Sequence, residues 1–493
     1  MPDESDGSLS EEDLWDLTKD EDDNVKAGAF FQLAVRASEK SDWNTALVPA
    51  GTARQLYSKL GDENNEGRAA YTEGHMYFNL ERFAEALEAF QTAAERYRIS
   101  ATEEMLADAV KSVAVCFENL KDFDSASLNY LSAINIYEAN KLYTAAGIAS
   151  LDFGDLQGGN GQQSKALETF EDSLRIFQLG GDIIGSGRSH DRIAAAQIDL
   201  GHLDDALEHL REAHNIFEYI RDESRLIYAK YRLGWTLVMK EQWLDAVPLL
   251  REASEGYKSK TWFLQAANSD SQLAHALSNL GQEEEAVALY QSTRSVYEAG
   301  GDFKNALIAD GNAATRIAAV NPHNAAVMLR RIVAGARELD DQWIVRVMST
   351  RLAEALKKVD TDESNAEGLE VLLGITEEDW GEELKERVRY LAALGEALIE
   401  NNRDGEAREA FEKVVSYGYE SGFLAESARA YASLAFLENE ENNKDKSNEF
   451  VAQAIAYYLA AGEDEKARNL SRNLLPSSMS KSDVIQADGS PTE

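Results

Sequence analysis

The chain repeats one helical segment every forty residues, and this period restricts its fold more than any other feature. An alanine recurs at that interval, at Ala46, Ala86, Ala126, Ala166, Ala206, Ala246, Ala286, Ala326 and Ala366. After one inserted residue the series continues with Ala407 and Ser447. Copies of this length form a core only by stacking on one another, so the sequence predicts a solenoid rather than several globular domains.

Each repeat contains two helical patterns, with small and large residues at fixed places. A small residue stands twelve positions before the anchor alanine, at Ala34, Gly74, Ala114, Gly154, Ala194, Gly234, Ala274, Ala314, Gly395 and Ala435. A large residue stands four positions after the anchor, at Phe90, Tyr130, Phe170, Leu210, Leu250 and Tyr290. An aromatic residue stands eleven positions after it, at Tyr57, Tyr97, Tyr137, Phe177, Phe217, Tyr257 and Tyr297. Interdigitating helix layers require this alternation of size, so we predict an all-α fold.

Turn residues and breaks in the period divide the chain. Several second helices are expected to end in Gly-Asp, where glycine suits the left-handed position and aspartate caps the next helix, at Gly61-Asp62, Gly181-Asp182 and Gly301-Asp302. Glu354 replaces an expected small residue, and Gly368 falls inside a second helix, so a joint is expected there. We therefore expect an acidic disordered tail at 1–25, a main array at 26–358, an irregular repeat or joint at 359–382, further repeats at 383–470 and a disordered tail at 471–493.

The charge of the chain limits its partners. Its 88 acidic and 49 basic residues give a formal net charge of −39. Nucleic acids and anionic membranes both need a basic face, so we expect neither as a partner, and a locally basic groove would be an exception in this chain. The single cysteine, Cys116, lies in an apolar helical segment and is expected to be a buried, unreactive thiol. No signal peptide or membrane-spanning run is evident, and we expect a cytoplasmic protein.

The first 25 residues carry eleven acids and one lysine, Lys19. Such a segment is expected to be disordered because it has little apolar surface to bury. Within it, Leu14, Trp15 and Leu17 are apolar residues in an acidic context. One interpretation is a frayed tail or a cap on the first repeat. The alternative is a short motif, Leu14–Leu17, that docks in a groove of this chain or of another.

No pattern of catalytic or metal-binding residues is present. The histidines lack HExxH spacing, and no Gly-x-Ser-x-Gly or P-loop motif occurs. The glycine-rich run at 158–161 has no preceding strand, which a phosphate-binding loop of that kind needs. We therefore expect no enzymatic activity, no metal and no cofactor.

The repeat resembles the tetratricopeptide repeat. Gly74, Tyr77, Phe83, Ala86 and Phe90 follow the order of that motif, and the spacing from Gly74 to Ala86 is the family's own. The period of forty, with Gly-Asp between copies, resembles the extended-helix variety found in kinesin light chains and cell-polarity adaptors. The resemblance covers about 440 residues and implies a right-handed α-solenoid, a superhelix of about eleven antiparallel helix pairs.

The resemblance also implies a binding groove, because first helices line the concave side of the superhelix in this family. Carrying its groove positions over by register gives candidate residues at Arg68, Tyr71, His75, Asn79, Lys111, Asn119, Arg188, Asp191, Tyr228, Tyr231, Trp235, Asn268, Ser271, His275 and Asn279. A row of asparagines can hold the backbone of an extended peptide, since each carboxamide both donates and accepts. Tyr228, Tyr231 and Trp235 form a stripe that either lines the groove or packs between repeats.

The function expected from this pattern is a non-catalytic scaffold or adaptor that binds a protein or an extended peptide in its concave groove. The alternative is a ligand-responsive regulatory sensor whose superhelix changes pitch when it binds a signal peptide, as the resemblance to bacterial peptide-sensing repeat proteins suggests. A purely architectural spacer is a third, weaker alternative.

Overall fold

The computed structural model describes residues 9–376, residue 380 and residues 383–472. This part of the chain contains helices and no strand. The chain divides into two compact units, Met1–Asp245 and Ala246–Glu493, with the boundary inside α13 (Trp243–Ser259). The joint expected at 359–382 therefore lies inside the second unit. There, the second helix of the irregular repeat, α19, has 12 residues, whereas α17, the second helix of the preceding repeat, has 17.

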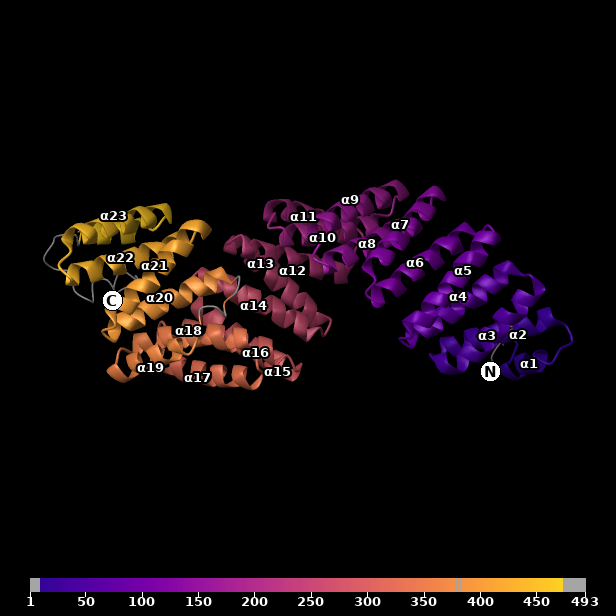
Figure 1. Cartoon of the computed structure of the whole chain (residues 1–493), viewed down its shortest axis with the longest axis horizontal. Coiled ribbons are helices and arrows are strands. Elements are labelled where there is room, and N and C mark those ends of the chain that lie inside the picture. Colours follow the sequence, from indigo (N-terminus) through magenta and orange to yellow (C-terminus); the bar gives the residue numbers. More distant parts are fainter. Residues whose placement is uncertain (1–8, 377–379, 381–382, 473–493) are drawn as a thin grey trace. The chain divides into compact units, whose positions relative to one another are not determined.

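The first unit contains twelve helices before α13 within its described residues. They are α1 (Glu11–Leu17), α2 (Asp23–Glu39), α3 (Trp43–Leu60), α4 (Glu63–Asn79), α5 (Phe83–Ile99), α6 (Glu103–Asn119), α7 (Phe123–Ala139), α8 (Tyr143–Gly159), α9 (Gln163–Gly180), α10 (Ile183–Asp199), α11 (Leu203–Tyr219) and α12 (Glu223–Met239). Each helix from α1 to α11 packs against the next one along the chain, and Figure 1 shows this succession.

The second unit continues the same pattern after α13. Its helices are α14 (Phe263–Asn279), α15 (Glu283–Ala299), α16 (Phe303–Ile317), α17 (Pro322–Glu338), α18 (Gln342–Val359), α19 (Asp362–Leu373), α20 (Leu384–Glu400), α21 (Asp404–Ser421), α22 (Leu424–Glu440), α23 (Lys444–Ala460) and α24 (Asp464–Arg472). The helices from α2 to α23 form the eleven pairs that the period predicts. The all-α solenoid of antiparallel helix pairs is thus confirmed.

The first helix of each pair lies in an inner layer. First helices of neighbouring repeats contact each other in both units, in the pairs α2–α4, α8–α10, α16–α18, α18–α20 and α20–α22. In a curved stack, the helices that approach each other in this way lie on the inner side. The predicted groove residues all stand on the first helices of their pairs.

Contact between small and large residues explains why the pairs pack so closely. A Cβ atom added at Gly74 would lie 2.7 Å from the ring of Phe90, and one added at Gly154 would lie 2.4 Å from the ring of Phe170. A Cβ atom added at Gly395 would lie 2.7 Å from the ring of Phe411. A larger side chain at these glycines would force the two helices apart.

A turn with one left-handed residue joins consecutive helices. Such a residue recurs at twenty-residue steps through most of the first unit, and it is often not glycine, as at Glu81, Ala101 and Lys121. The following amide donates to a carbonyl five residues back, as from Asp62 to Tyr57 at 3.0 Å, and this bond offsets the cost of the left-handed conformation. The predicted cap is also present, because the Asp62 carboxylate accepts from the amide of Asn65 at 3.1 Å.

The N-terminal segment differs from the expectation of disorder. Residues 11–17 form α1, which begins with a capping box between Ser10 and Asp13. Leu14 is fully buried, α1 packs on α2, and Trp15 meets the ring of Phe30 edge-on at 6.4 Å. One buried leucine and a capped first turn order this helix despite its acidic composition. The tail expected from residue 471 falls almost entirely outside the described residues.

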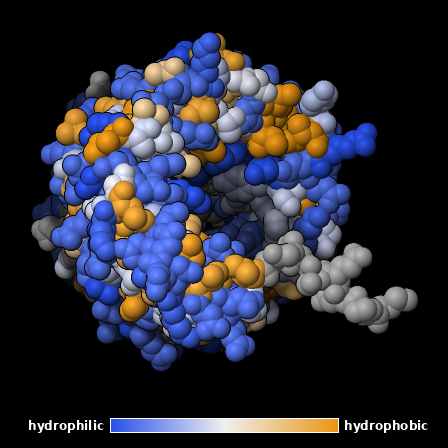
Figure 2. Space-filling model, turned by 90° about the vertical axis from the view of Figure 1, so that its right-hand side faces the viewer, coloured by the Kyte–Doolittle hydropathy of each residue, from blue (hydrophilic) through white to orange (hydrophobic). Residues whose placement is uncertain are grey.

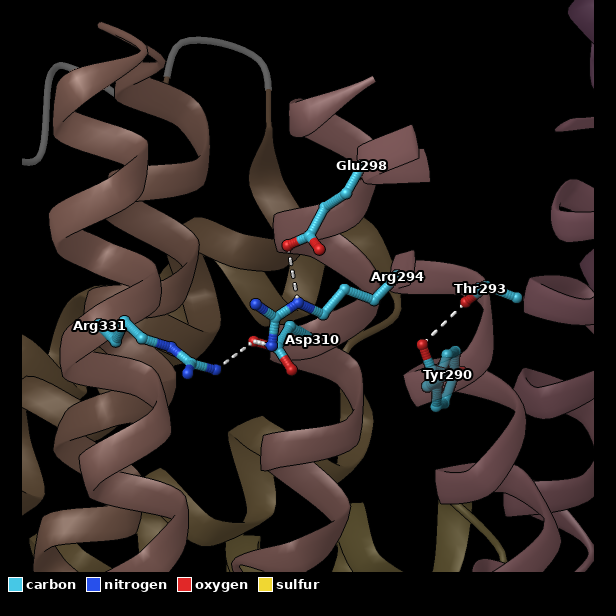
Figure 3. Close-up of polar contacts among 6 residues, drawn as sticks. All are labelled: Tyr290, Thr293, Arg294, Glu298, Asp310 and Arg331. Atoms are coloured by element: carbon cyan, nitrogen blue, oxygen red, sulfur yellow. Dashed lines mark hydrogen bonds and ion pairs between the residues drawn. The ribbon is translucent and has the colours of Figure 1, made fainter. Parts of the chain in front are cut away.

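A buried carboxylate joins three helices in the second unit. Asp310 on α16 is 3% exposed and accepts hydrogen bonds from Arg294 on α15 at 3.0 Å and from Arg331 on α17 at 2.9 Å (Figure 3). Glu298 accepts from Arg294 on the solvent side at 2.9 Å. Two arginines thus compensate one buried negative charge. The face in Figure 2 is mostly hydrophilic with separate hydrophobic patches.

Candidate functional site

Fourteen of the fifteen predicted groove residues reach solvent at least in part. The exposed members are Arg68, His75, Asn79, Asn119, Tyr228, Asn268 and Asn279. The half-buried members are Tyr71, Lys111, Arg188, Tyr231, Trp235, Ser271 and His275. Asp191 is buried. Those on α4, α6, α10 and α12 belong to the first unit, and those on α14 belong to the second.

The asparagine row has a structural explanation that needs no ligand. Asn79, Asn119 and Asn279 are the last residues of α4, α6 and α14. Each side-chain amide donates to the carbonyl four residues earlier in its own helix, at 2.7, 2.8 and 2.9 Å. Each bond adds a second donor to a carbonyl group in the last turns of the same helix, so these side chains are engaged with their own backbone. Asn268 is also engaged, because its side-chain oxygen accepts from the hydroxyl of Tyr297 at 2.8 Å.

The candidate residues on α4 and α6 form local contacts. The ring of Tyr71 lies edge-on to His75 at 4.6 Å and to Phe90 at 5.4 Å. Lys111 on α6 pairs with Asp152 on α8 at 3.6 Å. The ring contacts lie within one repeat, whereas the Lys111–Asp152 pair joins the inner helices of neighbouring repeats.

A cleft in the first unit brings three of the predicted residues together. It has a volume of about 150 Å³, and its lining comes from α8, α10, α11 and α12. The lining residues are Leu151, Arg188, Asp191, Arg192, Phe217, Arg225 and Tyr228. We call this site the arginine cleft. Three arginines face one aspartate there, so the site is locally basic within a chain whose net charge is −39.

Two of the three arginines already have acidic partners. Arg192 pairs with Asp155 on α8 at 3.0 Å, and Arg225 pairs with Asp222, the N-cap of α12. Arg188 makes no hydrogen bond or ion pair with any of the residues that the structure describes, although its charge acts to lower the pKa of Asp155 on α8. The Arg188 guanidinium is therefore the group in the cleft whose hydrogen-bond donors are not used within the chain.

A buried pair behind the cleft holds Tyr228 in place. Arg232 donates to the hydroxyl oxygen of Tyr228 at 3.1 Å, and its guanidinium lies 5.8 Å from the centre of the Tyr228 ring. Burial lowers the pKa of Arg232, but Asp191 and Tyr228 outweigh that effect and raise it. Burial raises the pKa of Asp191 against the attraction of Arg232. Because the Tyr228 oxygen accepts from Arg232, its own proton is free to point to another acceptor.

The aromatic stripe on α12 borders this site. Tyr228 is 39% exposed, whereas Tyr231 and Trp235 are half-buried. The Arg232 guanidinium lies 5.9 Å from the centre of the Trp235 ring, within cation–π range. The stripe thus combines packing at Tyr231 and Trp235 with an exposed edge at Tyr228.

The register of the repeat missed Arg192, Arg225 and Arg232. Their signal in the sequence was weak: Arg192 stands four residues after Arg188, and Arg225 and Arg232 flank Tyr228. In a helix, a spacing of three or four places residues on one face, but it does not say which face points to the groove.

Other reactive groups lie outside the cleft. His190 and His209 share a hydrogen bond between their Nδ1 atoms at 2.8 Å, and burial, then the charge of His209, lowers the pKa of His190 to about 4. Burial raises the pKa of Cys116 to about 12. Within the described ranges, no three His, Cys, Asp or Glu side chains are arranged to hold a metal ion. None of the helices there has the length and apolarity of a membrane span.

The fold and the inner-layer cleft define a helical repeat protein of the α-solenoid class. The sequence profile of the tetratricopeptide repeat matches residues 67–99 and 388–417, which lie in the pairs α4–α5 and α20–α21. These two segments are tetratricopeptide repeats by sequence, and the other forty-residue repeats of the chain are similar to them. A comparison with curated proteins found no match.

Several solved structures are similar to parts of this chain. Aspartyl phosphate phosphatase F from Bacillus subtilis is 14% identical over 57% of this chain and 73% of its own, with a TM-score of 0.41. The apo quorum sensor NprR from B. thuringiensis is 18% identical over 57% and 80%, with a TM-score of 0.37. Repeats of a kinesin light chain from Podosopora anserina are 14% identical over 41% and 100%, with a TM-score of 0.36. At these values, the function must be argued from this chain's own residues.

Proposed function

We propose that this chain is a non-catalytic scaffold that holds an extended peptide, or an extended segment of a partner protein, along the inner helices of its first unit. The arginine cleft and the exposed edge of Tyr228 form the anchor. One observation carries the proposal: a basic, aromatic cleft lies on the inner layer of an otherwise acidic chain. Arginine and tyrosine in a partly desolvated pocket are typical of residues that dominate binding energy.

The lining of the cleft favours binding over catalysis. It contains no serine, cysteine or histidine, and its one acid, Asp191, lies beside Arg232 and Arg192. A nucleophile activated by a nearby base is therefore missing from the site. The expectations of a cytoplasmic location and of no nucleic-acid or membrane partner rest on composition alone.

Selection of a displayed random dodecapeptide library on the full chain tests the proposal. Peptides that bind are synthesised, and their Kd is measured by calorimetry for the wild type and for Tyr228→Ala. We expect at least a tenfold weaker Kd for the variant. Tyr219→Ala is the matched control, because Tyr219 is 78% exposed on the second helix α11 and should not contact the peptide. Failure to select any peptide would refute the function, and equal affinity of Tyr228→Ala would refute the site.

The sensor alternative adds a change of pitch to the same binding event. X-ray scattering of the full chain with and without a selected peptide tests it. A scaffold keeps its radius of gyration, whereas a sensor becomes measurably more compact.

A further inference from the structure

We propose that the arginine cleft recognises a side-chain carboxylate, so that the bound peptide carries one Asp or Glu as its anchor. This inference rests on the proposed function and names the chemistry that the ligand must bring. Arg188 supplies the main contact, and the Tyr228 hydroxyl supplies a second donor.

The pairing of the cleft arginines shows which of their hydrogen-bond donors are available to a ligand. Asp155 holds Arg192, and Asp222 holds Arg225. Arg188, half-buried on α10, lines the same cleft without a hydrogen bond or ion pair in the described part of the chain. A planar guanidinium with free donors matches a carboxylate, which can accept two parallel hydrogen bonds.

Tyr228 is arranged to add a hydrogen bond from the opposite helix. Its oxygen accepts from Arg232 at 3.1 Å, which leaves its proton for an acceptor within the cleft. Asp191 is near Arg232 and raises its pKa, so Arg232 stays charged behind the tyrosine. A carboxylate in the cleft would thus accept from α10 on one side and from α12 on the other.

The net charge of the chain indicates how much negative charge the ligand can carry. A chain at −39 repels an approaching anion at long range, and this repulsion grows with the ligand's charge. Asp152 and Asp155 on α8 lie on the same inner layer as the cleft. We therefore expect one acidic residue among neutral or basic neighbours, rather than a phosphate group or an acidic run.

The selected dodecapeptides supply the probe. We expect them to share one Asp or Glu and to have a net charge of zero or above. Replacing that acid by its amide should weaken binding to the wild type at least tenfold. Replacing it by phosphoserine, or amidating the peptide's C-terminus, separates a side-chain carboxylate from a phosphate and from a terminal carboxylate.

A double-variant cycle assigns the contact to Arg188. Arg188→Gln should weaken binding of the acidic peptide at least tenfold and leave binding of its amide form unchanged. Arg188→Lys should retain part of the affinity, and a helical circular dichroism spectrum checks that both variants fold. Arg211→Gln is the matched control, because Arg211 is exposed on the second helix α11 and does not line the cleft. We expect it to bind like the wild type.

Three results would overturn the inference. Selected peptides that lack acids but still depend on Tyr228 would refute carboxylate recognition and leave the proposed function standing. Arg188→Gln could bind the acidic peptide as well as the wild type does. The phosphoserine or the terminal carboxylate could prove the stronger ligand. If no peptide is selected, the inference falls together with the proposed function.

Discussion

Arg389 on α20 binds the carboxylate of Glu354 on α18 through both Nε and Nη2, with the Nε bond at 2.7 Å. Glu354 stands where the repeat elsewhere has a small residue. The side chains are 36% and 31% exposed, so the pair is neither fully buried nor a free surface pair. The irregular repeat thus replaces a close helix contact by an ion pair between neighbouring inner helices.

Glu354→Ala separates the two explanations of this position. Packing alone predicts a neutral or stabilising effect, because alanine restores the small residue. The ion pair predicts a free energy of unfolding lower by about 1–2 kcal/mol, between the values for exposed and buried pairs, because Arg389 is left beside Arg351. Urea denaturation measures the difference. Glu406→Ala, which removes an exposed pair with Arg403, is the control and should change stability by less than about 0.5 kcal/mol.

The same pair has a predictable pH dependence. Burial raises the pKa of Glu354, but Arg389 outweighs it and the net shift is downward. A carboxyl with a lowered folded-state pKa contributes stability above its unfolded pKa and loses it as the pH falls through the folded value. The difference between wild type and Glu354→Ala should therefore be constant near pH 7 and shrink below about pH 4.5.

Asp310→Asn should destabilise the second unit more than any change to its exposed neighbour. The substitution removes the charge that compensates Arg294 and Arg331, and Asp310 is 3% exposed (Figure 3). We expect a loss of about 2 kcal/mol, because both arginines can still reach water in part. Glu298→Gln, on the solvent side of Arg294, is the control and should cost less than about 0.5 kcal/mol. Equal losses for both variants would contradict the role assigned to Asp310.

The His190–His209 pair should make the first unit less stable in acid. The folded pKa of His190 is about 4, against about 6.5 for a free histidine, so the unfolded chain binds more protons between these values. Stability should therefore fall by about 3 kcal/mol as the pH drops from 7 to 4. Histidine NMR titration measures the midpoint directly, and His190→Gln should flatten the pH dependence. A midpoint near 6.5 would show that the pair does not hold His190 neutral.

Leu14→Ala tests whether α1 is only a cap. Leu14 is fully buried against α2, so the variant should free α1 and speed proteolysis at residues 18–22. If α1 only caps the first repeat, the Kd for a selected peptide stays unchanged. Tighter binding by this variant, or by a chain lacking residues 1–25, would instead support docking of Leu14–Leu17 in the groove.

The sequence predicted the elements of the fold because a period is visible without a structure. The contact between Gly74 and Phe90 follows from size and spacing alone. The sequence did not predict the left-handed turn residues. The hydrogen bond from the Arg82 amide to the Tyr77 carbonyl stabilises the turn, so Glu81 adopts a conformation that is expected of glycine. The order of α1 was also missed, because average acidity hides a single buried leucine.

The candidate site was predictable only in part. Register placed Arg188, Asp191 and Tyr228 on inner helices, where they line one cleft. It could not show that Arg192 is paired while Arg188 is not, because Asp155 lies on another helix, 37 residues away in the sequence. The asparagines recur at one position of the repeat because they are the last residues of their helices. In the sequence, this local role cannot be told apart from a row of peptide-binding residues.

The most direct test is a crystal structure of the full chain with a selected acidic peptide. The account predicts an extended peptide along α10 and α12, with its Asp or Glu carboxylate within hydrogen-bond distance of the Arg188 guanidinium and the Tyr228 hydroxyl. A peptide bound on the outward-facing helices α9 and α11, with the arginine cleft empty, would contradict it.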